Sequence, residues 1–305
     1  MRTYNLCKSF GKNFSVSSLS INIKKGDIYG FIGPNGSGKT TVMKTILGLL
    51  TPDSGIVELF GKQNNRQALR RVGSLIESPG LYGDCTAHEN MKRFSIISGG
   101  DEQEINSLLN FVGLGDVGKK KVKSFSLGMK QRLGIAVALL GKPELLILDE
   151  PVNALDPMGI KAIRDMILQI NKDMGVTFFI SSHLLGELEK ICNVYGIINM
   201  GRLTEEITVE ELKTLCGNRI YIGCDKPEQA AKLIRENFNV AGNINVGIDY
   251  VEIDIDSSLA SEINQALILS GINITEIKST GISYEDFFLQ KMGSFDVGKG
   301  VGKYA

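Results

Sequence analysis

The chain has 305 residues, enough for one large domain or for one domain with a smaller companion. Its 34 basic and 34 acidic side chains balance, so we expect no nucleic-acid partner, and no apolar run is long enough to span a bilayer. No signal peptide opens the sequence, and five scattered cysteines without a C-x-x-C pair favour reduced thiols in a cytosolic chain.

The N-terminal third of the sequence alternates strands with one early helix. Apolar patterning and turn signals predict strands over 3–9, 15–23 and 27–32. A helical pattern from Lys39 to Leu50 follows, and then strands are predicted over 55–60 and 72–76.

The middle of the chain changes from a mixed pattern to a helical one and back. Residues 84–141 are helical in pattern and broken by glycines, whereas 145–148 and 176–180 are short apolar runs typical of buried parallel strands. A helix that begins with a proline is predicted over 157–173. Strand, helix, strand in this order predicts a mainly parallel α/β sheet.

Residues 219–290 form a separate pattern that predicts a small α+β domain of the β-α-β-β-α-β type. Its expected strands and helices are 219–224, 228–237, 251–255, 258–269 and 272–277. We place the linker near 216–218, so that the first domain covers 1–216, and residues 291–305 end the chain as a loose tail.

The most informative motif is the phosphate-binding P-loop, G-x-x-x-x-G-K-[ST], between the strand at 28–32 and the helix at 39–50. Its glycines let the backbone wrap around an anion, and its N–H groups and the helix N-terminus then face the phosphates. We expect Lys39 to reach the β- and γ-phosphates and the Thr40 hydroxyl to hold Mg²⁺. The expected nucleotide contacts are Gly33, Pro34, Asn35, Gly36, Ser37, Gly38, Lys39, Thr40 and Thr41.

A second signal is the pair of carboxylates that follows the apolar run at 145–148. A strand that ends in Asp149 and Glu150 presents them at the carboxyl edge of the sheet, where open α/β sheets bind ligands. Asp149 is expected to hold Mg²⁺, and Glu150 is expected to act as general base toward the attacking water. Without a P-loop in the same chain, an Asp-Glu pair would be an ordinary strand end.

A third motif is the loop at 125–128, Phe-Ser-Leu-Gly, which leads into a helical run over 129–140. The N-terminus of a helix can bind phosphate. Taken alone, this turn is more often a simple cap.

Together these motifs resemble the nucleotide-binding subunit of an ABC transporter over about residues 2–215. The resemblance implies that Ser126 and Gly128 bind the γ-phosphate of ATP held by a second subunit. Asp156, in the loop 153–156, corresponds to the D-loop at the dimer interface, and His183 corresponds to the switch histidine that contacts the γ-phosphate. Phe10 lies where an aromatic ring stacks on adenine, although Tyr4 and Phe14 are nearby alternatives or Phe10 is plain core.

Two positions depart from the family pattern. Leu127 and Met129 replace a glycine and a glutamine of the usual signature loop, while the phosphate-facing serine and glycine remain. Glu77 stands where the family normally has a glutamine that senses Mg²⁺ and the attacking water. We therefore place Glu77 among the catalytic and metal residues, and the alternative is a neutral replacement. This glutamate and the signature loop resemble the bacitracin and lantibiotic-immunity branch, whose transporters move antimicrobial peptides away from the cell.

The resemblance also implies an architecture and a set of partners. The expected fold is a P-loop NTPase with a mixed or parallel sheet, an N-terminal antiparallel β-subdomain and a helical subdomain at about 84–141, followed by the small C-terminal domain. The expected ligands are ATP and Mg²⁺, and the expected partners are a second copy of the subunit and a separate membrane permease, at the cytoplasmic face of the membrane. The alternatives are a non-transport ABC ATPase that acts on nucleic acid or ribosomes, and a regulatory subunit with a dead site.

Overall fold

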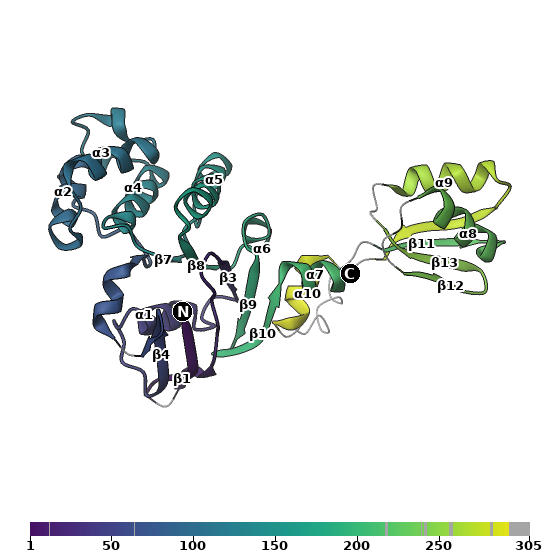
Figure 1. The fold of residues 1–305 in the computed structure, drawn as a ribbon, viewed down its shortest axis with the longest axis horizontal. Coiled ribbons are helices and arrows are strands. Elements are labelled where there is room, and N and C mark those ends of the chain that lie inside the picture. The colour runs from purple at the N-terminus through teal and green to yellow at the C-terminus, as the bar shows by residue number, and fades with distance from the viewer. Residues whose placement is uncertain are drawn as a thin grey trace, which may run out of the picture. The chain divides into compact units, whose positions relative to one another are not determined.

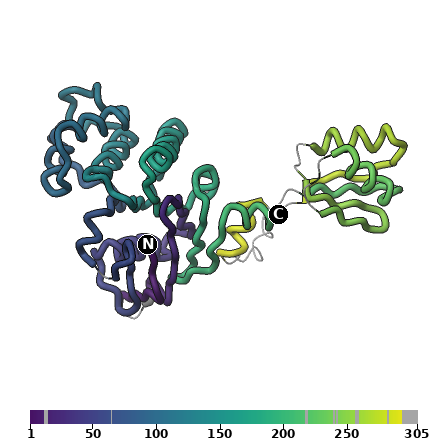
Figure 2. The backbone as a smooth tube through the Cα atoms, viewed as in Figure 1, coloured from purple at the N-terminus to yellow at the C-terminus, as the bar shows by residue number. Residues whose placement is uncertain are grey.

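The structure is a computed structural model that describes residues 1–11, 13–63, 65–216, 219–238, 240, 243–255, 259–280 and 283–292. It divides into two compact units, one formed by 1–208 with 291 and 292 and the other by 209–290 (Figures 1 and 2). The expected linker residues Gly217 and Asn218, and the tail from 293 onward, lie outside the described residues. Helix α7 (Val209–Leu215) groups with the second unit.

The first sheet of the first unit is antiparallel, as expected for an N-terminal β-subdomain. Strand β1 (Arg2–Phe10) lies between β2 (Asn13–Leu19) and β4 (Ser54–Leu59), and β5 (Lys62–Gln63) pairs with β4. The second strand ends at Leu19 and not at Ile23 as predicted. After Leu19 the chain still follows β1, because the Ile21 N–H donates to the Thr3 hydroxyl, and Ile21 stays buried without joining the ladder.

The second sheet is mainly parallel and carries the site. Within the described residues its strand order is β10-β9-β3-β8-β7-β6. Neighbouring strands from β9 to β6 run parallel, and only β10 pairs antiparallel, with β9. The strands are β3 (Ile28–Ile32), β6 (Val72–Leu75), β7 (Leu145–Asp149), β8 (Thr177–Ser182), β9 (Val194–Asn199) and β10 (Arg202–Thr208). The two sheets confirm the predicted P-loop NTPase fold class.

Two features of this unit differ from the sequence prediction. Helix α1 (Lys39–Ile46) ends four residues before the predicted Leu50, because Gly48 adopts a left-handed conformation with φ 70° that breaks the helix. Strands β9 and β10 were not predicted, although Tyr195, Ile197 and Ile198 form an apolar run and are fully buried.

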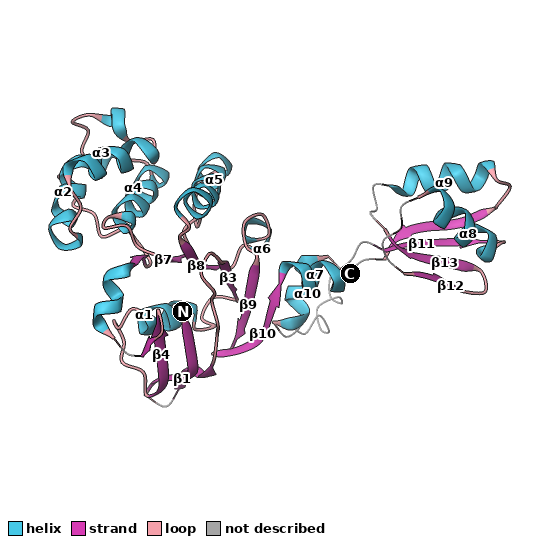
Figure 3. Cartoon of the chain, viewed as in Figure 1, coloured by secondary structure: helices cyan, strands magenta, loops and turns pink. Residues whose placement is uncertain are grey.

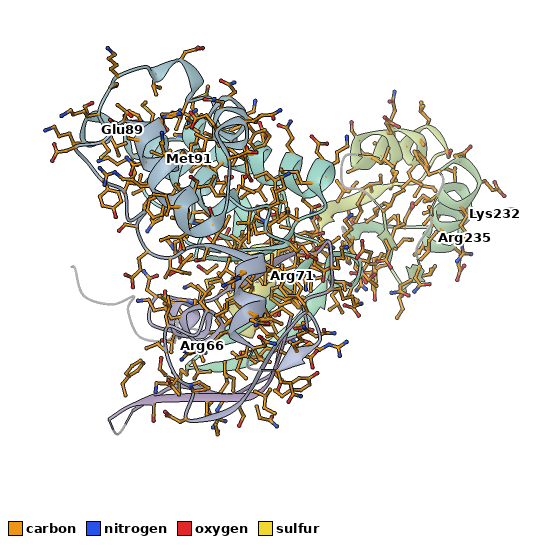
Figure 4. The ribbon with its side chains drawn as sticks, turned by 60° about the vertical axis from the view of Figure 1, so that its left-hand side comes forward. Arg66, Arg71, Glu89, Met91, Lys232 and Arg235 are labelled. Atoms are coloured by element: carbon orange, nitrogen blue, oxygen red, sulfur yellow. The ribbon has the colours of Figure 1, made fainter. Side chains whose placement is uncertain are left out.

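The segment 84–141 folds into three helices, α2 (Ala87–Ser98), α3 (Glu102–Phe111) and α4 (Leu127–Leu139), as the helical pattern predicted. Helix α2 begins with a capping box in which the Thr86 hydroxyl and the Glu89 carboxylate accept backbone N–H bonds. Figure 4 labels Glu89 near this helix start and Met91, whose side chain is fully buried in the subdomain. Gly99, in the left-handed region, ends the helix.

Helix α5 (Pro157–Met174) and the short helix α6 (Leu185–Leu188) follow strands β7 and β8. Short 3-10 turns η1 (Arg66–Arg71), η2 (Gly115–Val117) and η3 (Val122–Ser124) connect the other elements, and Figure 4 labels both ends of η1. Among the helices described, none has the length and apolar character that crossing a membrane requires.

The second unit has the strand and helix order of ferredoxin-like folds. Its antiparallel sheet has the order β12-β13-β11-β14, with α8 and α9 on one face (Figure 1). The buried core lies between that face and the helices and includes Ile222, Ile253, Ile234 and Ile263. The elements are β11 (Arg219–Cys224), α8 (Pro227–Asn237), β12 (Ile244–Val246), β13 (Tyr250–Asp254), α9 (Ala260–Leu269), β14 (Ile274–Ser279) and α10 (Tyr284–Lys291).

Candidate active site

The predicted site residues gather at the carboxyl edge of the parallel sheet. The P-loop follows β3, Glu77 follows β6, Asp149 ends β7 with Glu150 directly after it, and His183 follows β8. Because these strands are parallel, their carboxyl ends lie along one edge, where the loops in Figure 3 leave the strands. Segments that are more than 100 residues apart in the sequence are therefore neighbours here, as the hydrogen bond between Thr40 and Asp149 demonstrates.

The backbone of the P-loop passes so close to its neighbours that two positions require glycine. A Cβ atom on Gly33 would lie 2.3 Å from the Ile198 carbonyl oxygen, and one on Gly38 would lie 2.4 Å from the Ser15 carbonyl oxygen. Gly38 also has φ 106° and caps helix α1 without any side-chain hydrogen bond, so the first N–H groups of the helix have no side-chain acceptor there. This is the arrangement that a helix N-terminus needs in order to bind an anion.

The middle of the P-loop is less crowded than its two ends. Nothing would contact a Cβ atom on Gly36, whose φ is 80°. Pro34 and Asn35 lie in the turn before it, and the Pro34 carbonyl accepts a bond from the Ser37 N–H. The buried Ser37 hydroxyl has no hydrogen-bond partner among the described residues.

Lys39 is buried, and its ammonium lies under the loop. Nζ donates to the carbonyl oxygens of Gly33, at 2.7 Å, and of Pro34, at 3.2 Å. The same atom lies 3.5 Å from Oε1 of Glu150. A buried ammonium needs such partners because desolvation is unfavourable for a charge. The lysine thus links the phosphate loop directly to the carboxylate of Glu150, the residue after β7.

Asp149 is the centre of a buried polar network. One carboxylate oxygen accepts a bond from the Thr40 hydroxyl at 2.8 Å, and the other accepts one from the Ser181 hydroxyl at 2.5 Å. The Ser181 hydroxyl in turn accepts the Glu150 N–H at 3.0 Å. Ser181 therefore fixes both acidic residues, a role that the sequence prediction missed. Its position near the end of β8, the strand that pairs with β7, could have indicated this role.

Glu150 contacts one of the other two catalytic candidates, His183. Its Oε2 lies 2.7 Å from Nδ1 of His183, and its Oε1 has no hydrogen-bond partner among the described residues beyond the longer contact with Lys39. His183 thus lies beside the Glu150 carboxylate, at the end of the next strand along the sheet.

Three residues around this edge hold a left-handed backbone that is unusual outside glycine. The φ angles are 62° at Glu77, 49° at Glu150 and 58° at Ala154. Such conformations are costly for residues with a Cβ and gather at functional sites. The exposed Glu77 carboxylate pairs with Lys44 of α1, with 2.5 Å between Nζ and Oε1. The sequence prediction missed Lys44, although its place five residues after Lys39 keeps it on the P-loop helix.

The other predicted contacts lie at helix starts or on the surface. Ser126 caps α4 by accepting the Met129 N–H, and Asp156 caps α5 by accepting the Gly159 N–H. A Cβ atom on Gly128 would lie 3.9 Å from a methyl of Leu155, so the signature loop and the D-loop of one chain are adjacent. Thr41 shares a hydrogen bond with Ser15.

The predicted adenine-stacking residue, Phe10, lies on the surface. Its side chain is 53% exposed, with the Lys8 ammonium near its ring, so it is not a core residue. The side chain of the alternative candidate Phe14 lies outside the described residues.

The oxygen donors at this edge fit a magnesium ion. Mg²⁺ is usually held by one or two carboxylates together with phosphate oxygens and water. The Thr40 hydroxyl and the Asp149 carboxylate are already side by side, next to the phosphate loop. Glu77, the other predicted metal residue, follows strand β6 at the same edge of the sheet, where its exposed carboxylate pairs with Lys44.

A glycine-rich loop between a parallel strand and a helix, with a threonine bonded to the aspartate of a neighbouring strand, defines a P-loop nucleotide-binding protein. Residues 16–153 match the ABC transporter family. A bacitracin transport ATP-binding protein from Bacillus licheniformis is 43% identical over 98% of this chain and 99% of its own length. The chain therefore belongs to the family of ABC transporter ATP-binding proteins.

Further relatives agree with this assignment. A lantibiotic transport ATP-binding protein from Streptococcus pyogenes is 45% identical over 72% of this chain and 97% of its own length. A crystallised ATP-binding cassette of an ABC transporter, in its ADP conformation, superposes with a TM-score of 0.64 at 26% identity, covering 70% of this chain and 93% of that one.

Proposed function

We propose that this chain binds and hydrolyses ATP at the cytoplasmic face of the membrane, and that it powers a separate permease that moves an antimicrobial peptide out of reach of the cell. The observation that carries the proposal is the linked set Lys39, Thr40, Asp149, Glu150 and His183 at one sheet edge. The full-length similarity to a bacitracin transport ATP-binding protein supports the class of cargo.

Binding would use the loop and its lysine. The N–H groups at the start of α1 face the phosphates, and Lys39 exchanges its carbonyl contacts for phosphate oxygens. Bound Mg²⁺ would neutralise phosphate charge between Thr40 and Asp149. Phe10, exposed at the end of strand β1 in the antiparallel sheet, would stack on the adenine ring.

Hydrolysis would place Glu150 as the general base. Its carboxylate accepts a proton from a water molecule as that oxygen bonds to the γ-phosphorus, while the bond between the γ-phosphorus and the bridging oxygen breaks and ADP keeps the electron pair. His183 holds Glu150 through Nδ1, which leaves Nε2 as the nitrogen available to the γ-phosphate.

The site is half of a pair. Ser126 and Gly128 lie on a different loop from the P-loop, at the start of α4, next to the D-loop at Leu155. We infer that they complete the site of a second copy, with Asp156 at the interface between the two. ATP would then join two subunits face to face, and hydrolysis would separate them. The output would reach the permease through Glu77 and the helical subdomain that follows it.

The deciding experiment uses the variant Glu150→Gln. It should bind Mg-ATP, hydrolyse little, and accumulate as a dimer, since the base is lost while the binding residues remain. Lys39→Ala is the matched control, which should neither bind ATP nor dimerise with it. A Glu150→Gln chain that stays monomeric under saturating Mg-ATP contradicts the scheme.

The cargo is tested separately in cells. Expression of the chain with its permease should raise the concentration of bacitracin or of a lantibiotic that stops growth, and Glu150→Gln should abolish that protection. If neither compound distinguishes the two strains, the proposed cargo class is wrong even where the ATPase assay succeeds.

A further inference from the structure

Strand β14 is an open edge of the sheet in the second unit. The sheet order places β14 beyond β11, and no described strand pairs with its other side. Residues Thr275, Glu276, Lys278 and Ser279 are exposed. An exposed edge strand presents unpaired N–H and C=O groups that can pair with another chain. We propose that β14 pairs antiparallel with β14 of a second copy of this protein across a twofold axis.

The hydrogen-bonding pattern of β14 shows which groups are free. The Thr280 N–H donates to the Arg219 carbonyl at 2.8 Å, so Thr280 and Arg219 form a hydrogen-bonded pair. Opposite residues of an antiparallel pair alternate between bonded and non-bonded. The next bonded pair is Lys278 with Tyr221, and Ile277, opposite Ile222, is non-bonded. The N–H and C=O of Ile277 therefore point to the free edge.

A twofold axis at Ile277 brings opposite charges together. In that register Ile277 of each copy bonds to Ile277 of the other, and Glu276 of one copy faces Lys278 of the other, twice. Both side chains lie on the same face of the sheet, because Nζ of Lys278 is 3.1 Å from Glu276 and 4.6 Å from the ring of Tyr221. Each copy thus supplies one acid and one base, and a self-complementary surface is what a symmetric dimer requires.

The other face of the edge offers apolar surface to the same partner. A groove of about 480 Å³ runs between α9 and β14, and its lining includes Ile268, Ile272 and Ile277. Ile268 is 55% exposed. The twofold axis brings the equivalent α9 of the second copy alongside this groove. A lysine on an edge strand usually discourages pairing, but here the partner strand places a glutamate opposite it.

This association needs no nucleotide, which separates it from the ATP-dependent dimer. The test measures the mass of the full chain by sedimentation in EDTA without nucleotide. Glu276→Lys puts like charges opposite each other, and so does Lys278→Glu. Each variant alone should self-associate on the order of tenfold more weakly than the wild type, since exposed cross-strand pairs are individually modest. Mixed in equal amounts, the two variants should associate with each other, because lysines then face glutamates.

The mixture is also the control for folding, since a misfolded variant would not regain association. Lys39→Ala should self-associate like the wild type, so failure of the proposed ATPase leaves this result unchanged. A wild-type chain that is monomeric through the micromolar range overturns the proposal. A mixture of the two charge-reversal variants that associates no more strongly than either variant alone also overturns it. The free edge of β14 would then be available to a segment of a different protein.

Discussion

The ammonium of Lys44 lies 2.5 Å from the carboxylate of Glu77, which joins the P-loop helix to the end of strand β6. If Glu77 acts at the nucleotide site as proposed, this contact would compensate the negative charge that its carboxylate brings there. In Lys44→Met the Glu77 carboxylate is free to attract a cation. We expect the Mg²⁺ concentration for half-maximal ATPase activity to fall by about two- to fivefold, the range for an exposed ion pair.

Glu77→Gln supplies the control for this pair, because it removes the charge that Lys44 compensates. Adding Lys44→Met to Glu77→Gln should not change Mg²⁺ dependence further. Lys123→Met breaks a more exposed pair with Asp84 in the helical subdomain and should leave Mg²⁺ dependence at the wild-type value. Mg²⁺-dependent binding of a fluorescent nucleotide gives the same readout without turnover. Equal effects of Lys44→Met in both backgrounds would show that the pair has no such role.

Ser181→Ala should reduce both stability and activity. Its hydroxyl is fully buried and bonds to Asp149 and to the Glu150 N–H, so its loss leaves a buried carboxylate oxygen without its donor. We expect about 1–3 kcal/mol less free energy of unfolding and a lower kcat. Ser182→Ala is matched in burial, and the hydroxyl it removes bonds only to the backbone of Leu184, accepting from its N–H and donating to its carbonyl oxygen among the described residues. It should therefore lose stability and keep kcat. Equal loss of kcat in both variants would mean that Ser181 does not position the acids.

Gly73→Ala should destabilise the first unit through overpacking alone. A Cβ atom on Gly73 would lie 1.9 Å from the Ala138 carbonyl oxygen, where β6 packs on α4. We expect a loss of about 1–3 kcal/mol in thermal or denaturant unfolding. Gly186→Ala, in helix α6 with nothing within 4 Å of its Cβ, should be neutral or slightly stabilising. A Gly73→Ala variant as stable as the wild type would contradict this packing.

Cys7 should react with thiol reagents before the three buried cysteines, Cys192, Cys216 and Cys224. Hydrogen bonds from Ser54 and from the Ser18 N–H lower the pKa of Cys7, whereas burial raises the pKa of Cys192, Cys216 and Cys224. A lowered pKa means that the thiolate of Cys7 forms at lower pH, so its labelling should start at a pH where the buried thiols are inert. Mass spectrometry of peptides after brief labelling measures the order, and Cys7→Ser should remove the label on that peptide while the buried cysteines stay unlabelled. A buried cysteine labelled before Cys7 would refute the ordering.

The sequence predicts those helices and strands of this fold that have a strong local pattern. It does not predict side-chain partners and element ends that depend on contacts between distant segments. Turn signals and apolar runs predict β3 and β7 almost to the residue. The early end of α1 depends on the left-handed backbone at Gly48, and a helical pattern that continues to Leu50 conceals it. The P-loop follows from its motif. The partner of Glu77 cannot be predicted in this way, because Lys44 belongs to another element and a charged surface residue has many possible neighbours.

The left-handed backbone at Glu150 has a consequence for attempts to make this protein more robust. A residue with a Cβ at φ 49° is held in a conformation that glycine adopts freely. A screen for thermal stability alone would accept Glu150→Gly because it relieves this backbone strain, although it removes the carboxylate that we propose as the general base. Libraries made from this protein therefore need a selection for turnover beside the one for stability.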